Sequence, residues 1–264
     1  MLEIKNITKV FNPGTANEKV ALNDVSLTLE DGDFVTIIGS NGAGKSTLLN
    51  AVAGAFLCDN GKILIDDHDI TRSPEHKRAR FIGRVFQNPL MGTAADMQIE
   101  ENLALAARRG KRRGLKWAIT KNEREEYRKL LADFNLGLEE RLTTKVGLLS
   151  GGQRQSVALL MATINRPKVL LLDEHTAALD PKTAIKVLEL TDKIVSQEKL
   201  TTIMVTHNMK DAIAHGNRLI MMNAGRIIFE ASGEEKKKLT VEMLLEQFSK
   251  TSGEEFSNDR ALLG

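Results

Sequence analysis

The chain has 264 residues, of which 42% are hydrophobic, and this is enough apolar material for the buried core of one large domain or two modest ones. Its 37 Lys and Arg residues nearly balance 35 Asp and Glu, so the net charge of +2 gives no reason to expect a nucleic acid as partner. A single cysteine, Cys58, excludes an internal disulfide framework, and we expect it to be a small buried or half-buried hydrophobic side chain.

Apolar and alternating runs predict short strands, separated by helical patterns and by turns rich in glycine and asparagine. The runs are Leu2–Val10, Val20–Leu29, Phe34–Ile38, Gly61–Asp66, Phe81–Phe86, Val169–Asp173, Thr201–Thr206 and Arg218–Met222. This layout predicts an α/β fold, and the fully apolar runs indicate a parallel sheet covered on both faces, which usually binds ligands at the carboxyl ends of its strands. Every apolar run is too short to cross a bilayer, so we expect any membrane span to come from another chain.

We predict one domain over residues 1–264. Residues 1–88 and 165–230 form its α/β core, residues 89–164 form an inserted helical subdomain, and residues 231–264 form a helical tail. The basic run Arg108–Lys116 in the insertion leaves two interpretations open, a solvated helix face or a contact with lipid headgroups or a membrane partner.

The segment GSNGAGKST follows the predicted strand FVTII directly and opens a helical pattern. It matches the phosphate-binding loop G-x-x-x-x-G-K-[ST], in which backbone N–H groups and a helix N-terminus surround phosphate oxygens. Lys45 is expected to neutralise the β- and γ-phosphates and Ser46 to ligate Mg²⁺. The sequence therefore predicts a nucleoside triphosphate site at Gly39, Ser40, Asn41, Gly42, Ala43, Gly44, Lys45, Ser46 and Thr47.

The guanine-recognition motif N-K-x-D is missing from the sequence. Phe11, in the loop between the first two predicted strands, could stack on the base, and such a contact discriminates weakly among bases. The alternative is that Phe11 only covers the edge of the sheet.

The run KVLLLDEHTAALD ends in two adjacent carboxylates, Asp173 and Glu174, followed by His175. With a phosphate loop present, Asp173 is expected beside the Mg²⁺ held by Ser46, and Glu174 is expected to polarise the attacking water. A zinc site formed by these three consecutive residues is unattractive, because their side chains diverge on an extended chain.

The segment LLSGGQRQ contains L-S-G-G-Q unaltered and precedes the predicted strand that carries Asp173. The chain thereby resembles ABC-type ATPases, and further elements of that family follow in order: VFQNP with Gln87, AALD with Asp180 and VTHN with His207. The resemblance implies a RecA-like P-loop core with an antiparallel β-subdomain and an inserted helical subdomain. It also implies ATP hydrolysis, with Gln87 at the metal, Asp180 in the D-loop, and His207 at the γ-phosphate or the attacking water.

The signature residues Ser150, Gly151, Gly152 and Gln153 begin a predicted helix, whose N-terminus offers a second anion site. In the family this site closes on ATP held by a second copy in a head-to-tail dimer. The resemblance further implies an integral-membrane permease as partner, a position on the cytoplasmic face of the membrane, and import of a small solute such as an amino acid, with a substrate-binding protein as an optional component.

Two alternatives stay open at this point, an exporter subunit and a soluble ATPase of iron–sulfur assembly. Three positions depart from the common family pattern: His175 stands where proline is usual, and Ser156 and Met161 stand where arginines are usual. We expect His175 to be a tolerated variation that takes no part in the reaction. The alternative is that its protonation tunes Glu174 from a distance. We expect three other histidines, His68, His76 and His215, to be surface residues.

Overall fold

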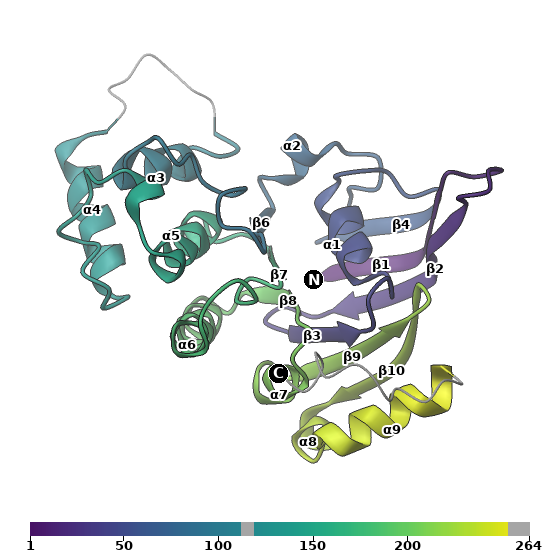
Figure 1. Cartoon of the computed structure of the whole chain (residues 1–264). Coiled ribbons are helices and arrows are strands. Elements are labelled where there is room, and N and C mark those ends of the chain that lie inside the picture. Colours follow the sequence, from purple (N-terminus) through teal and green to yellow (C-terminus); the bar gives the residue numbers. More distant parts are fainter. Residues whose placement is uncertain (112–118, 253–264) are drawn as a thin grey trace.

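The computed structural model describes residues 1–111 and 119–252, and within them the strands form two sheets (Figure 1). The first sheet has the order β2-β1-β4-β5 and is antiparallel throughout. Its strands are β1 (Leu2–Phe11), β2 (Lys19–Leu29), β4 (Asn60–Ile65) and β5 (His68–Asp69). The antiparallel β-subdomain expected from the N-terminal runs is present.

The second sheet has the order β10-β9-β3-β8-β7-β6 and is parallel except for the pair β9–β10. Its strands are β3 (Phe34–Gly39), β6 (Ile82–Val85), β7 (Val169–Asp173), β8 (Thr201–Val205), β9 (Arg218–Asn223) and β10 (Arg226–Ser232). All eight predicted strands are confirmed. The prediction missed the two-residue β5 and missed β10, which returns antiparallel along the sheet edge after a turn in which Ala224 and Gly225 have positive φ.

Helices cover both faces of the six-stranded sheet. One face packs against α1 and the four-stranded sheet, and the other packs against α5, α6, α7 and α9. Figure 1 shows α3, α4 and α5 gathered beside the edge strand β6, away from α1. The helices are α1 (Lys45–Ala53), α2 (Glu75–Arg78), α3 (Ile99–Ala107), α4 (Lys121–Ala132), α5 (Gly151–Thr163), α6 (Pro181–Glu198), α7 (Met209–Ala214), α8 (Gly233–Lys237) and α9 (Val241–Ser252).

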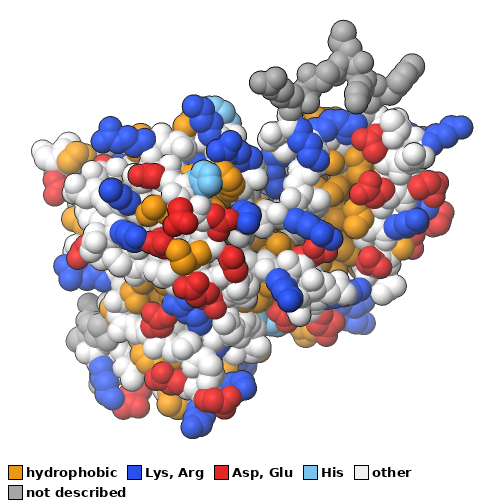
Figure 2. All heavy atoms as spheres, turned by 180° about the vertical axis from the view of Figure 1, so that it is seen from behind, with side chains coloured by type: hydrophobic (Ala, Val, Ile, Leu, Met, Phe, Trp, Pro, Cys, Tyr) orange, Lys and Arg blue, Asp and Glu red, His pale blue; other side chains and the backbone are white. Residues whose placement is uncertain are grey.

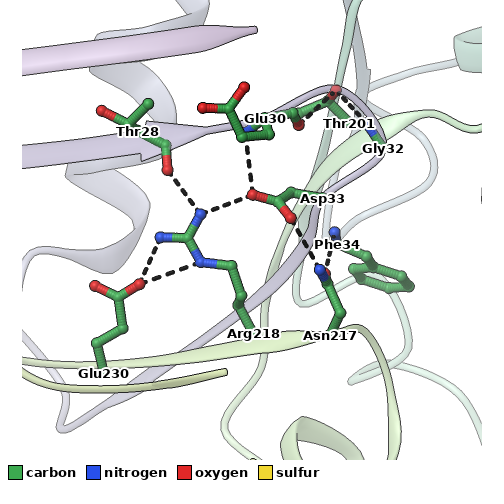
Figure 3. A network of polar contacts seen from close by, with 9 residues as sticks. All are labelled: Thr28, Glu30, Gly32, Asp33, Phe34, Thr201, Asn217, Arg218 and Glu230. Atoms are coloured by element: carbon green, nitrogen blue, oxygen red, sulfur yellow. Dashed lines mark hydrogen bonds and ion pairs between the residues drawn. The ribbon is translucent and has the colours of Figure 1, made fainter. Parts of the chain in front are cut away.

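A polar network fastens the first sheet to the second (Figure 3). Arg218, at the start of β9, donates to the Thr28 carbonyl of β2 at 2.7 Å and forms ion pairs with Asp33 at 2.7 Å and Glu230 at 2.5 Å. Asn217 donates to the other Asp33 oxygen at 2.8 Å. Because these hydrogen bonds join three strands and the β2–β3 turn, they hold the base of β3, the strand that leads into the phosphate loop.

Charges of both signs are interspersed over the face shown in Figure 2. In the basic run, Arg108 binds Glu123 and the Ala104 carbonyl, and Arg109 donates to the Ala162 carbonyl of α5. These two arginines hold helices of this chain together, whereas Lys111 is exposed to solvent. Residues 112–116 lie outside the described residues.

His215 is partly buried, whereas the sequence analysis expected it at the surface. The side chain of His215 is only 16% exposed, and its Nδ1 lies 2.7 Å from an Asp192 oxygen of α6. The sequence did not reveal this contact, because α6 and α7 meet only in the folded chain. His68 and His76 are exposed and Cys58 is half-buried, as expected.

Candidate active site

The phosphate loop joins β3 to α1, and its backbone could be formed only by glycine at two positions. Gly44 has φ 101°, and a Cβ there would lie 2.6 Å from the Ala21 carbonyl oxygen. A Cβ on Gly39 would lie 2.3 Å from the Met222 carbonyl oxygen. The loop is therefore pressed against β2 and β9, and its N–H groups are free to converge on an anion.

Lys45 closes this loop from within. Its Nζ donates to the carbonyls of Gly39 at 2.7 Å and Ser40 at 3.1 Å, and the side chain is buried. Burial lowers the pKa of Lys45, while the carboxylates of Glu174 and Asp173 act to raise it. The ammonium group thus lies at the loop centre, where an incoming phosphate would meet it.

A cavity of about 210 Å³ opens over the loop. Phe11 lines it, with the ring 5.3 Å from that of Phe56 in an edge-on contact, so both interpretations of Phe11 fit its place at the cavity wall. Two lining residues, Lys19 and Ala21, were missed by the sequence analysis. The Lys19 ammonium group lies close to Gly42, and nothing in the local sequence of β2 predicts that this side chain lines the cavity.

The acidic end of β7 faces the start of α1. Ser46 Oγ donates to Asp173 Oδ1 at 3.3 Å, and the guanidinium of Arg84 lies 3.5 Å from Asp173 Oδ2. Burial raises the pKa of Asp173, and Arg84 and Ser46 act in the opposite direction. A hydroxyl and one carboxylate beside a phosphate-binding loop form the hard oxygen donor set that Mg²⁺ prefers, so Ser46 and Asp173 fit that ion.

Glu174 is held between two side chains from neighbouring loops. Its Oε2 lies 3.5 Å from Nδ1 of His207 and 3.5 Å from Nε2 of Gln87. The hydrogen bond to His207 lowers the pKa of Glu174 and in turn raises that of His207. Glu174 has φ 44°, an uncommon conformation that costs free energy and is often found at functional positions. The structure thus brings together three predicted residues from the segments that follow β6, β7 and β8.

His175 points away from this cluster. It is buried, and its Nε2 lies 3.1 Å from Thr191 Oγ1, whose single proton goes to the Val187 carbonyl at 2.8 Å. The neutral ring therefore donates its Nε2–H to Thr191. Burial lowers the pKa of His175 to about 4, so the ring is neutral at pH 7 and the alternative that its protonation tunes Glu174 does not fit. Among the described residues, no group of three His, Cys, Asp or Glu side chains could hold a metal ion.

The signature segment begins α5 and is solvent-exposed at its tip. Ser150 caps the helix by a reciprocal pair of hydrogen bonds with Gln153, at 3.3 and 3.2 Å. Ser150 and Gly151 are exposed, whereas Gly152 is buried and packs against Thr183 of α6. Asp180 accepts from the Thr183 N–H at 3.1 Å and caps α6. In the molecule, α5 and α1 lie in different halves (Figure 1).

These features define an ATP-binding cassette ATPase. They are a phosphate loop, two carboxylates that face it, and a helix that begins with two glycines and lies in a helical subdomain. The comparisons with known proteins agree. The model of the family described as ABC transporter matches residues 22–177, and the chain belongs to this family. It binds ATP and is an ATPase subunit of the kind that serves ABC transporters.

Relatives and solved structures resemble the chain over most of its length. It is 48% identical to the tyrosine transport ATP-binding protein of Clostridioides difficile, over 94% of this chain and 98% of that protein. It is 36% identical to the spermidine/putrescine import ATP-binding protein PotA of Haemophilus influenzae, over 89% of this chain and 59% of that longer protein. A dimeric ATP-binding cassette solved with ADP and Pi matches with a TM-score of 0.75 at 31% identity, covering 88% of this chain and 98% of the other.

Proposed function

We propose that the chain drives uptake of an amino acid by a membrane permease, from the cytoplasmic face of the membrane. The observation that carries this proposal is the 48% identity to a tyrosine transport ATP-binding protein, which extends over nearly the whole of both chains. Aromatic amino acids are therefore the first solutes to test. No helix of the described residues is long and apolar enough to cross a membrane.

The contacts of the site support a role for each predicted residue. Residues Gly39–Thr47 bind the phosphates, and Phe11 stacks on the base. Ser46 and Asp173 would hold Mg²⁺, with Gln87, which lies 3.5 Å from Glu174, as a further ligand, and the ion would stabilise the negative charge that develops on the phosphates. Glu174 accepts the proton of the attacking water, because it is ionised and lines the cavity over the phosphate loop. His207, hydrogen-bonded to Glu174, orients that carboxylate and donates to the γ-phosphate.

The signature residues Ser150–Gln153 act on a second copy of the chain. Their exposed helix N-terminus and their place in the half of the molecule away from α1 support a head-to-tail dimer with two ATP molecules at its interface. The solved cassette with which the chain aligns is itself described as dimeric.

The permease binds at a groove of about 380 Å³ along the edge strand β6, lined by apolar side chains together with Glu75, Arg84 and Arg109. Helices α3 and α5 wall the groove, and Met91 at its rim is 70% exposed. An apolar patch of this kind on an ATPase subunit, next to Gln87 of the active site, suits a helix of a membrane partner. A substrate-binding protein is a further component of this uptake system.

Uptake measurements test the proposal directly. In a strain lacking the gene, wild-type protein should restore accumulation of radiolabelled tyrosine, and Glu174→Gln should not. Equal uptake with both proteins would contradict the proposal. Copurification with a polytopic permease from detergent-solubilised membranes separates this function from iron–sulfur assembly, in which the ATPase acts on soluble partners.

A further inference from the structure

Arg84 lies where the groove and the active site meet. Strand β6 is the edge of its sheet, and Arg84 pairs in register with Leu171 of β7, two residues before Asp173. Since alternate side chains of a strand share a face, the side chains of Arg84, Leu171 and Asp173 lie on the same face of the sheet. Ile82 and Leu171 belong to the apolar cluster under α1, so this is the face that α1 covers.

The guanidinium of Arg84 touches three groups at once. Its Nη2 donates to Asn50 Oδ1 of α1 at 2.6 Å and lies 3.5 Å from Asp173 Oδ2. Its central carbon stacks on the Phe86 ring, 4.4 Å from the centroid. The side chain is 13% exposed, and Nε is buried without a hydrogen-bond partner. The hydrogen bond to Asn50 is short and the ion pair with Asp173 is long, so Asp173 is the partner that this guanidinium holds less firmly.

Arg84 and Phe86 also line the groove along β6. A molecule seated in the groove therefore contacts the ring on which the guanidinium stacks. The opposite end of the same guanidinium lies at a carboxylate of the active site. One side chain thus spans the distance between the two sites, without an intervening chain of contacts.

We propose that Arg84 is a positioning residue that holds Asp173 while the groove is empty and releases it for the metal when the groove is filled. This inference rests on the proposed function, since it takes the groove as the docking surface and Asp173 as a metal ligand. The physical reason is that Arg84 and the metal ion compete for the Asp173 carboxylate. A guanidinium on Oδ2 both occupies the carboxylate and repels a divalent cation bound to it, and in a partly buried site this repulsion is weakly screened.

Metal binding to the isolated protein tests the competition without any permease. Mn²⁺, whose free form is read by its electron paramagnetic resonance signal, is titrated into the ADP-bound chain at pH 8. Arg84→Met should bind Mn²⁺ about 3- to 10-fold more tightly than wild type, because one competing cation is gone. Arg84→Gln, which keeps a donor for Asn50 but carries no charge, should give the same result. It is the test variant if Arg84→Met fails to fold.

Arg80→Met is the matched control, because Arg80 also stacks on a neighbouring ring, that of Phe81, but is exposed and lines a different cavity. It should leave the Mn²⁺ affinity unchanged. Equal or weaker Mn²⁺ binding by both Arg84 variants would overturn the inference. Failure of the wild type to bind ADP or Mn²⁺ at all would instead contradict the proposed function.

The link to the groove is tested by filling it. Met161, a lining residue on α5, is replaced by tryptophan in the wild-type and Arg84→Met backgrounds. We expect Met161→Trp to tighten Mn²⁺ binding at least twofold when Arg84 is present and to have no effect when it is absent. Equal effects in the two backgrounds would show that the groove does not act through Arg84.

Discussion

The two anion-binding regions of this chain differ in how far their own chain completes them. The phosphate loop meets its partners inside the chain: Lys45 is buried on loop carbonyls, Ser46 binds Asp173, and Glu174 lies between Gln87 and His207. The signature helix presents its N-terminus to solvent. The phosphate loop is preorganised before ATP binds. The signature helix needs a binding surface from another molecule.

The two regions differ in the free energy that ATP binding costs them. Charged groups that are already paired and partly buried need little rearrangement when the substrate binds, so the phosphate-loop side favours binding by a single chain. An exposed helix N-terminus contributes little until water is excluded from it. Changes on the loop side should therefore alter ATP binding by a single copy, and changes on the signature side should alter only the hydrolysis that follows when two copies meet.

The largest effect should come from Glu174→Gln. Loss of a general base typically costs about 10²–10⁴-fold in turnover, while the phosphate loop is untouched and ATP binding persists. Steady-state phosphate release and equilibrium binding of a fluorescent ATP analogue measure the two quantities. Glu189→Gln, at an exposed position of α6, is the control and should behave as wild type. Wild-type turnover by Glu174→Gln would refute the assigned role.

Lys45→Ala should act on binding itself. The substitution removes the buried ammonium group at the centre of the loop, and charge-assisted hydrogen bonds are each worth about 1.5–3 kcal/mol, so affinity for ATP should fall about 10- to 100-fold. The same fluorescent titration checks this. Lys62→Ala, at an exposed position of β4, should leave the affinity unchanged. An unaltered affinity in Lys45→Ala would mean that the buried ammonium does not meet the phosphates.

His175 should make the free energy of unfolding depend on pH, although it takes no part in catalysis. Its pKa is about 4 in the folded chain against 6.5 for an unperturbed histidine, so the unfolded chain binds a proton that the folded chain excludes. Stability is therefore full above pH 6.5 and falls as the pH drops toward 4, with a loss of about 2 kcal/mol at pH 5. Urea unfolding at pH 7 and pH 5 should show this loss in wild type.

The loss should shrink in His175→Gln, which can still donate to Thr191 but carries no titrating ring. His68→Gln, at an exposed position, is the control and should keep the wild-type dependence. The same loss of stability in His175→Gln as in wild type would assign the pH effect to other groups.

The smallest effect should follow Asn208→Ala. Asn208 accepts from the N–H groups of Lys210 and Asp211 and caps α7, directly after His207. Removal of such a cap costs about 1 kcal/mol of folding free energy. Thermal unfolding measures the change, and ATP affinity should stay at the wild-type value because Asn208 does not line the cavity over the loop. A loss of ATP affinity with unchanged stability would reverse this interpretation.

Much of the fold and of the site could be predicted because local sequence determines it. The phosphate loop must follow a strand and open a helix, and its glycines supply the positive φ angles that the tight turn needs. Lys19, Arg84 and the burial of His175 could not be predicted. Each depends on which strands become neighbours, as when β6 is placed beside β7 and brings Arg84 to Asp173.

A mixture of two inactive variants shows most directly whether ATP hydrolysis needs two copies of the chain. Ser150→Arg blocks the exposed helix N-terminus and keeps the phosphate loop, whereas Lys45→Ala damages the loop and keeps the signature. Each alone should be nearly inactive in phosphate release. An equal mixture should recover part of the wild-type activity, because one site of the mixed dimer joins an intact loop to an intact signature. Full activity of Ser150→Arg alone at high dilution would contradict the account, since the chain would then hydrolyse ATP as a monomer.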